Sequence, residues 1–179
     1  IGYASASPYD FYDQGIEIGQ DGANTITNFG GGATLVYGLY GIYQNNIKVN
    51  NNTFSNSDAT GAVQYGIFFS TCINGNIDIN SNSLSLTSNA GTSQLTAIGL
   101  NTGTTSGTSN TVNVTNNTIT NFTRPTHTTG ATYFIYSTSN YPFVLNISNN
   151  NISNHSFPGT GIIYGIYQLS NPVSVNITN

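Results

Sequence analysis

The residues best suited to bind a ligand lie in two loops near the end of the chain. Arg124 and His127 fall in the loop Phe122-Thr-Arg-Pro-Thr-His127, and His155 falls in the equivalent loop one repeat later. If the repeats stack, these three side chains can meet on one edge of the molecule. Two histidines without a third ligand make a poor metal site, so we expect no metal there. A small ligand-binding cluster is the functional interpretation, and ordinary solvated loop residues are the alternative.

The acidic residues do not predict a catalytic pair. Glycosidases need two carboxylates on either side of the scissile bond, whereas the acids here are scattered. Glu17, Lys48 and Asp78 occupy the same position in three successive repeats, which predicts a cross-strand ladder of alternating charge. The remaining acids are Asp10 and Asp13 near the start of the chain, and the isolated Asp21 and Asp58. We therefore expect neither enzymatic activity nor a cofactor.

An aromatic segment in each repeat is the best candidate binding surface. These segments are Tyr40-Gly-Ile-Tyr43, Tyr65-Gly-Ile-Phe68, Thr96-Ala-Ile-Gly99, Tyr133-Phe-Ile-Tyr136 and Tyr164-Gly-Ile-Tyr167. If their shared isoleucine points inward, strand alternation directs Tyr43, Phe68, Tyr136 and Tyr167 outward, with an interruption at Gly99. An exposed aromatic strip is typical of a binding surface, and tyrosine suits stacking on sugars. Rings that merely stack on each other, or that a neighbouring segment covers, are the alternatives.

Three short strands per repeat must position these residues. The motif Asn-x-apolar-x-Asn, or a close variant of it, begins at Asn24, Asn52, Asn82, Asn117 and Asn150. An apolar-polar-apolar triplet precedes each motif and the aromatic segment follows it, and this period-two alternation indicates strands. Because self-similarity at this period marks a solenoid, we predict an all-β parallel β-helix of about five to six rungs.

The first asparagine of each motif predicts a structural ladder. Stacked at the rung spacing of about 4.8 Å, each amide can donate to one neighbour and accept from the other. We also expect this asparagine to occupy the left-handed conformation at a turn, which short amides tolerate. The asparagines are therefore predicted to form scaffold and not a site.

The segment Val112-Asn-Val-Thr-Asn-Asn-Thr-Ile-Thr-Asn121 resembles the repeats of the pectate-lyase-like right-handed parallel β-helix family. The resemblance covers roughly residues 15–179, and leaves 1–14 as a partial rung or cap. It implies the fold and a right-handed coil but no particular activity, because such repeats occur in lyases, hydrolases, tailspikes and surface adhesins. Relatives that cleave pectin-type sugars use clustered aspartates or an Asp-bound Ca²⁺ with a basic residue, and these rungs show neither pattern.

The composition fits a folded, exported protein. Asn, Thr, Ser and Gly make up 92 of the 179 residues, and charged residues only 4%. A net charge of −4 argues against nucleic-acid binding, which needs a basic surface. With no run of 18 apolar residues, we expect no membrane insertion. The single cysteine, Cys72, is predicted to be a core residue.

The sequence therefore favours a non-catalytic β-helical segment of a large cell-surface or secreted repeat protein, an adhesin or stalk, which binds glycan through its aromatic strip. Val175-Asn-Ile-Thr-Asn179 matches the lead-in Leu145-Asn-Ile-Ser-Asn149, so we expect the rest of a longer solenoid to be its main partner, with a surface glycan or another surface or secretion protein as a further one. The main alternative is a polysaccharide lyase or glycoside hydrolase whose catalytic rungs lie outside this segment. Columns of Thr and Ser beside each Asn motif leave ice binding as a minor alternative.

Overall fold

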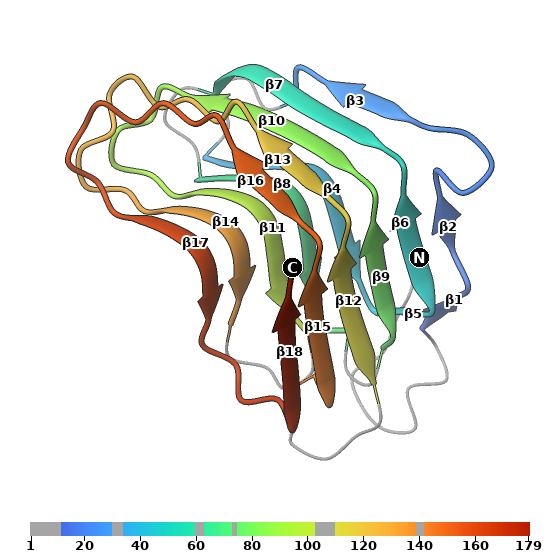
Figure 1. The fold of residues 1–179 in the computed structure, drawn as a ribbon. Coiled ribbons are helices and arrows are strands. Elements are labelled where there is room, and N and C mark those ends of the chain that lie inside the picture. Colours follow the sequence, from blue (N-terminus) through green and yellow to red (C-terminus); the bar gives the residue numbers. More distant parts are fainter. Residues whose placement is uncertain (1–11, 30–33, 60–62, 73–74, 103–109, 139–141) are drawn as a thin grey trace.

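The computed structural model is an all-β parallel solenoid of about five turns (Figure 1). The structure describes residues 12–29, 34–59, 63–72, 75–102, 110–138 and 142–179. The predicted fold class is thereby confirmed. Of the predicted cap at 1–14, residues 1–11 lie outside the described residues, and β1 (Asp13–Gln14) pairs with β5 (Gln44–Asn45).

Each turn contributes one strand to each of three parallel sheets, as the three repeating segments predict. The first sheet contains β2 (Glu17–Ile18), β6 (Ile47–Asn50), β9 (Ile77–Asn80), β12 (Thr111–Thr115), β15 (Val144–Ser148) and β18 (Ser174–Thr178). The second contains β3 (Thr25–Thr27), β7 (Thr53–Ala59), β10 (Ser83–Ser88), β13 (Thr118–Thr120) and β16 (Asn151–Ser153). The third contains β4 (Leu35–Ile42), β8 (Val63–Ser70), β11 (Leu95–Asn101), β14 (Thr132–Ser137) and β17 (Ile163–Gln168).

The core is a stack of apolar columns that runs along the axis of the solenoid. In the first sheet, Val49, Ile79 and Val114 are fully buried. The residue before each of them on its own strand faces outward, because side chains alternate between the two faces of a strand. The second and third sheets add Phe54, Leu84, Ile119, Ile67, Ile98 and Ile135, all with 0% exposure. Cys72 is buried in the same core, as predicted. Each rung is therefore stabilised mainly by the rungs on either side.

The predicted asparagine ladder is present at the junction of the first and second sheets. The Nδ2 groups of Asn24, Asn52, Asn82 and Asn117 each donate to the Oδ1 atom of the ladder asparagine in the next rung, at 2.9–3.1 Å. The same Oδ1 atoms also accept the backbone N–H of the preceding ladder residue. From Asn52 onward, Nδ2 in addition donates to a backbone carbonyl. The ladder thus gives hydrogen-bond partners to buried polar groups that would otherwise lack them where the chain turns from the first sheet to the second.

The left-handed residues at this corner differ from the prediction. It is the residue before the ladder asparagine that has positive φ, from 54° to 62°, and these residues are Asn51, Ser81, Asn116 and Asn149. Asn28, Asn121 and Asn154, at the other end of the motif, are also left-handed. The ladder residue itself does not turn the chain, because its amide must point along the axis to reach the next rung.

The predicted charge ladder lies on the outer face of the first sheet. Lys48 pairs in register with Glu17 on one side and Asp78 on the other. Its Nζ atom lies 2.6 Å from Glu17 Oε1. Asn113, Asn146 and Asn176 continue the same column, and each of the last two donates its amide to the one before. The column therefore changes from charge pairing to amide pairing along the solenoid.

Candidate functional site

The outer face of the third sheet carries the aromatic strip, which we define as Tyr37, Tyr40, Tyr65, Phe68, Tyr133, Tyr136, Tyr164 and Tyr167. Four of these rings lie on β4 and β8, and four on β14 and β17. Strand β11 separates the two groups, because Thr96 and Gly99 occupy the equivalent positions. The predicted interruption at Gly99 is therefore present.

The structure corrects the predicted register of the first aromatic segment. Tyr37 pairs with Tyr65, Leu39 with Ile67, and Tyr40 with Phe68. The segment Tyr37-Gly-Leu-Tyr40 thus fills the place that was predicted for Tyr40-Gly-Ile-Tyr43. Tyr43 instead lies just beyond β4 with φ 56°, and its ring centroid lies 5.9 Å from that of Tyr12. Tyr43 is therefore not part of the strip, whereas Phe68, Tyr136 and Tyr167 are.

Each of β4, β8, β14 and β17 presents two aromatic rings outward and not one, which simple alternation misses. Residues i and i+3 face outward because the two residues between them both face the interior. On β14 these inner residues are Phe134 and Ile135, which are 4% and 0% exposed. The ring centroids of Tyr133 and Tyr136 consequently lie 4.3 Å apart. The spacing Tyr-x-x-Tyr or Tyr-x-x-Phe was the available sequence signal for the second column.

The rings stack on one another along the solenoid. Tyr37 lies 5.4 Å from Tyr65 with an interplanar angle of 18°, and Tyr133 lies 5.0 Å from Tyr164 with an angle of 6°. Such offset stacking is the favoured arrangement for aromatic pairs. The stacking covers part of each ring face and leaves the rest of the strip to solvent. Tyr40 is the most exposed of the eight, at 47%.

The rings of Tyr65 and Phe68 pack closely over Gly99 in the middle rung. A Cβ atom at Gly99 would lie 2.7 Å from Phe68 Cδ2 and 3.1 Å from Tyr65 Cδ1. Gln94 Nε2 donates to the hydroxyl of Tyr65 at 3.2 Å and to Thr96 Oγ1 at 2.9 Å. Burial is the largest cause that raises the pKa of Tyr65, to about 12. Gly99 is therefore a packing requirement of the strip as well as a break in it.

Four of the tyrosines in the strip have a raised pKa and stay protonated at physiological pH. Burial raises the pKa of Tyr37, Tyr133 and Tyr136 above the usual value of 10, with neighbouring tyrosines adding to the effect. A protonated phenol both donates and accepts a hydrogen bond. The strip can therefore offer uncharged polar contacts beside apolar ring surface.

Arg124, expected to meet the two histidines on one edge of the molecule as a candidate ligand-binding residue, is fully buried beneath its loop. Its Nη1 donates to the carbonyls of Gly130 and Ala131 and to Thr132 Oγ1, at 3.0–3.3 Å. Its Nη2 donates to the carbonyls of Ala90 and Ser93, both at 2.5 Å. Burial lowers its pKa to about 10, so the guanidinium stays charged at neutral pH. Arg124 thus binds the loops of two successive rungs to each other.

His127 is buried beside Arg124, while His155 is half-buried. His127 Nε2 lies 2.5 Å from the carbonyl oxygen of Gly130, and His155 Nδ1 accepts the backbone N–H of Phe122 at 3.2 Å. The His155 ring stacks on Phe134 at 4.1 Å. Burial lowers the pKa of both histidines, and Arg124 contributes for His127. These contacts pack the loops together. A ligand from solution therefore cannot reach Arg124 or His127.

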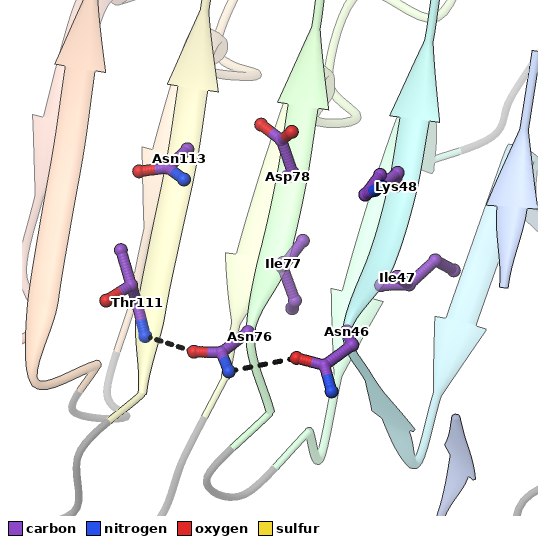
Figure 2. Close-up of a pocket in the computed structure, with 8 residues that line it drawn as sticks. All are labelled: Asn46, Ile47, Lys48, Asn76, Ile77, Asp78, Thr111 and Asn113. Atoms are coloured by element: carbon purple, nitrogen blue, oxygen red, sulfur yellow. Dashed lines mark hydrogen bonds between the residues drawn. The ribbon is translucent and has the colours of Figure 1, made fainter. Parts of the chain in front are cut away.

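A shallow hollow of about 220 Å³ lies on the outer face of the first sheet, where β6, β9 and β12 are adjacent (Figure 2). Lys48 and Asp78 lie on neighbouring strands there, with Asn113 on the third. Asn76 Nδ2 donates to Asn46 Oδ1, and the backbone N–H of Thr111 donates to Asn76 Oδ1. The hydrogen bond to Glu17 is the main cause that raises the pKa of Lys48. Lys48 is thus already engaged by a carboxylate.

Asp13 and Asp21 do not line the hollow. Gln44 Nε2 donates to Asp13 Oδ2 at 3.0 Å, and Asp21 is exposed. Asp58 lies on β7, and Asp10 lies outside the described residues. Within the ranges that the structure describes, no three His, Cys, Asp or Glu side chains are grouped as a metal site would need. No helix in those ranges is long and apolar enough to cross a membrane.

Comparison with protein-family models, with curated proteins and with solved structures finds no match to this chain.

Proposed function

We propose that this chain is a non-catalytic solenoid segment of a large exported repeat protein, an adhesin or stalk, and that it binds glycan through the aromatic strip. The observation that carries the proposal is the gathering of eight aromatic rings, seven of them tyrosines, on the outer face of one sheet. Sugar C–H groups pack against aromatic rings while sugar hydroxyls exchange hydrogen bonds with phenols.

The chemistry of the strip favours a neutral glycan. Burial raises the pKa of Tyr37, Tyr65, Tyr133 and Tyr136 further above physiological pH, so these phenols carry no charge that would attract a charged sugar. A formal net charge of −4 weakly disfavours approach by an acidic polymer. We therefore expect uncharged oligosaccharides to bind better than uronic-acid polymers.

The proposed setting follows from the repeat and from its surface. The resemblance to the pectate-lyase-like right-handed β-helix repeats supports a setting in a protein built from many such rungs. The outward columns are mostly Asn, Thr, Ser and Tyr, as suits a protein that acts outside the cell. We propose an extracellular or cell-surface location on this basis.

Further rungs are the proposed partner of the last turn. Ile166 and Ile177 are 37% and 51% exposed, whereas the equivalent Ile135 and Ile147 one turn earlier are 0% and 2% exposed. Another rung of the same kind would bury these side chains and pair with β16, β17 and β18. This partner is the remainder of a longer solenoid.

A glycan array probed with the 179-residue chain tests the proposal. For a glycan that the wild-type chain binds, Tyr40→Ala should weaken binding about five-fold. This corresponds to about 1 kcal/mol, the value of a modest interface contact. Tyr40→Phe keeps the ring and is the matched control for the contribution of the hydroxyl. Equal binding by wild type and Tyr40→Ala would count against the strip. Release of new reducing ends from a bound polysaccharide would overturn the non-catalytic assignment.

A further inference from the structure

Two tyrosines on successive rungs of the third sheet stack with nearly parallel ring planes. Tyr133 on β14 and Tyr164 on β17 are directly paired in register. Their ring centroids lie 5.0 Å apart and their planes differ by only 6°. Both rings are half-buried on the outer face, so part of each is exposed to solvent and can donate an electron to an oxidant at the surface. The pair Tyr12 and Tyr43, by contrast, is 5.9 Å apart and tilted by 44°.

Strand β17 is the outermost strand of the third sheet within the described ranges. Ile163 beside the pair is 45% exposed. A covalent bond between β14 and β17 would join two successive rungs of the solenoid to each other.

We propose that Tyr133 and Tyr164 are an oxidative coupling site at which a dityrosine bond joins the last two complete rungs. A one-electron oxidant, such as a haem peroxidase with hydrogen peroxide, removes one electron and one proton from each phenol. The two phenoxyl radicals then form one C–C bond between ring carbons ortho to the hydroxyls, and two ring protons shift to restore the phenols. Overall the pair loses two electrons and two protons, and one H₂O₂ becomes two H₂O. The stack favours this reaction because it holds the two phenol rings nearly parallel and side by side, with their centroids 5.0 Å apart, before either is oxidised.

The proposal does not depend on glycan binding, and its consequence is mechanical. The bond would close a loop of about 30 residues and would restrict the unfolded chain. For a chain of this size, we expect the melting temperature to rise on the order of 10 °C.

The folded 179-residue chain should be treated with a haem peroxidase and limiting H₂O₂ at low protein concentration. We expect dityrosine fluorescence, an intact monomer mass lower by two hydrogens, and a Tyr133–Tyr164 cross-linked peptide after thermolysin digestion. Tyr164→Phe and Tyr133→Phe should each abolish that peptide, whereas Tyr43→Phe should leave it unchanged. Cleavage after Lys48 identifies any coupling of Tyr37 to Tyr65, because that bond would join the two fragments.

Three results would overturn the proposal. One is that the product links only Tyr133 to Tyr136, whose rings are closer but tilted by 32°. Another is that Tyr164→Phe gives as much intramolecular dityrosine as the wild type. The third is that the chain unfolded in urea yields the Tyr133–Tyr164 peptide as efficiently as the folded chain, since the fold would then contribute nothing.

Discussion

Replacement of Asn117 by alanine tests how much the asparagine ladder contributes to stability. Asn117 is fully buried. Its Oδ1 accepts the backbone N–H of Asn82 at 2.9 Å and Asn82 Nδ2 at 3.0 Å. Its Nδ2 donates to the carbonyl of Ile79 at 2.9 Å and to Asn150 Oδ1 at 3.0 Å. Asn117→Ala therefore removes four hydrogen bonds from the interior.

The magnitude follows from the groups that the substitution leaves unpaired. The two donors of Asn82 and the carbonyl of Ile79 stay buried, and each such group costs about 1–3 kcal/mol. Allowing for relaxation, we expect a loss of about 4 kcal/mol in the free energy of unfolding. For a chain of this length, that loss lowers the melting temperature on the order of 10 °C.

The assay is thermal and urea unfolding followed by far-ultraviolet circular dichroism, with Asn113→Ala as the matched control. Asn113 lies on the same rung but is half-buried on the outer face, where its Oδ1 accepts a hydrogen bond from Asn146 at 2.8 Å. Water can replace that bond, so we expect a loss of about 0.5 kcal/mol for the control. If Asn117→Ala costs no more than Asn113→Ala, the ladder does not stabilise the solenoid.

Three further predictions concern the charged and titratable residues. Arg124→Ala should lower the free energy of unfolding by about 3 kcal/mol, because it leaves buried carbonyl groups without a hydrogen-bond donor. In the same urea assay, Arg124→Lys should recover only part of this loss. An unchanged urea midpoint would contradict the conclusion that Arg124 joins the loops of successive rungs. Burial lowers the pKa of His127 from 6.5. The neutral ring therefore contributes stability above about pH 6.5, and this stability is lost as the pH falls through the lower folded-state pKa. Urea midpoints measured below and above about pH 6.5 should show this loss, and His127→Gln should make the pH profile flatter. An equally steep profile in the variant would refute the assignment of the pH dependence to His127. Lys48→Glu places like charges beside Glu17 and Asp78 and should lower the melting temperature slightly, with Lys48→Gln as the control. Because salt screens charges, about 1 M NaCl should remove the difference in melting temperature between the two variants. A loss that does not depend on salt would exclude the electrostatic cause.

The sequence alone determined the fold and its polar and charged ladders. Parallel in-register stacking forces each rung to meet the same chemical demand at the same place, so that demand is visible in the chain as a repeat. Asn24, Asn52, Asn82, Asn117 and Asn150 recur because each amide needs another amide above it. Glu17, Lys48 and Asp78 alternate in sign because they are cross-strand neighbours.

The tertiary structure alone decided which aromatic residues share a surface. Tyr37-Gly-Leu-Tyr40 and Tyr40-Gly-Ile-Tyr43 overlap in the sequence, and either could continue the aromatic column. Pairing of Tyr37 with Tyr65 selects the first, because register depends on the turns before the strand and on the fit to the next rung. The second outward column likewise depends on a bend with two adjacent inward residues, which a period of two does not encode.

Burial of the loop residues was also beyond the sequence. Arg124 and His127 lie in a polar loop of the kind that is usually solvated, and nothing local indicates otherwise. Arg124 is buried because carbonyls of Ala90, Ser93 and Gly130, from two successive rungs, converge on its guanidinium. Repetition along the chain thus records what every rung needs, whereas contacts made once, between loops of different length, exist only in the folded molecule.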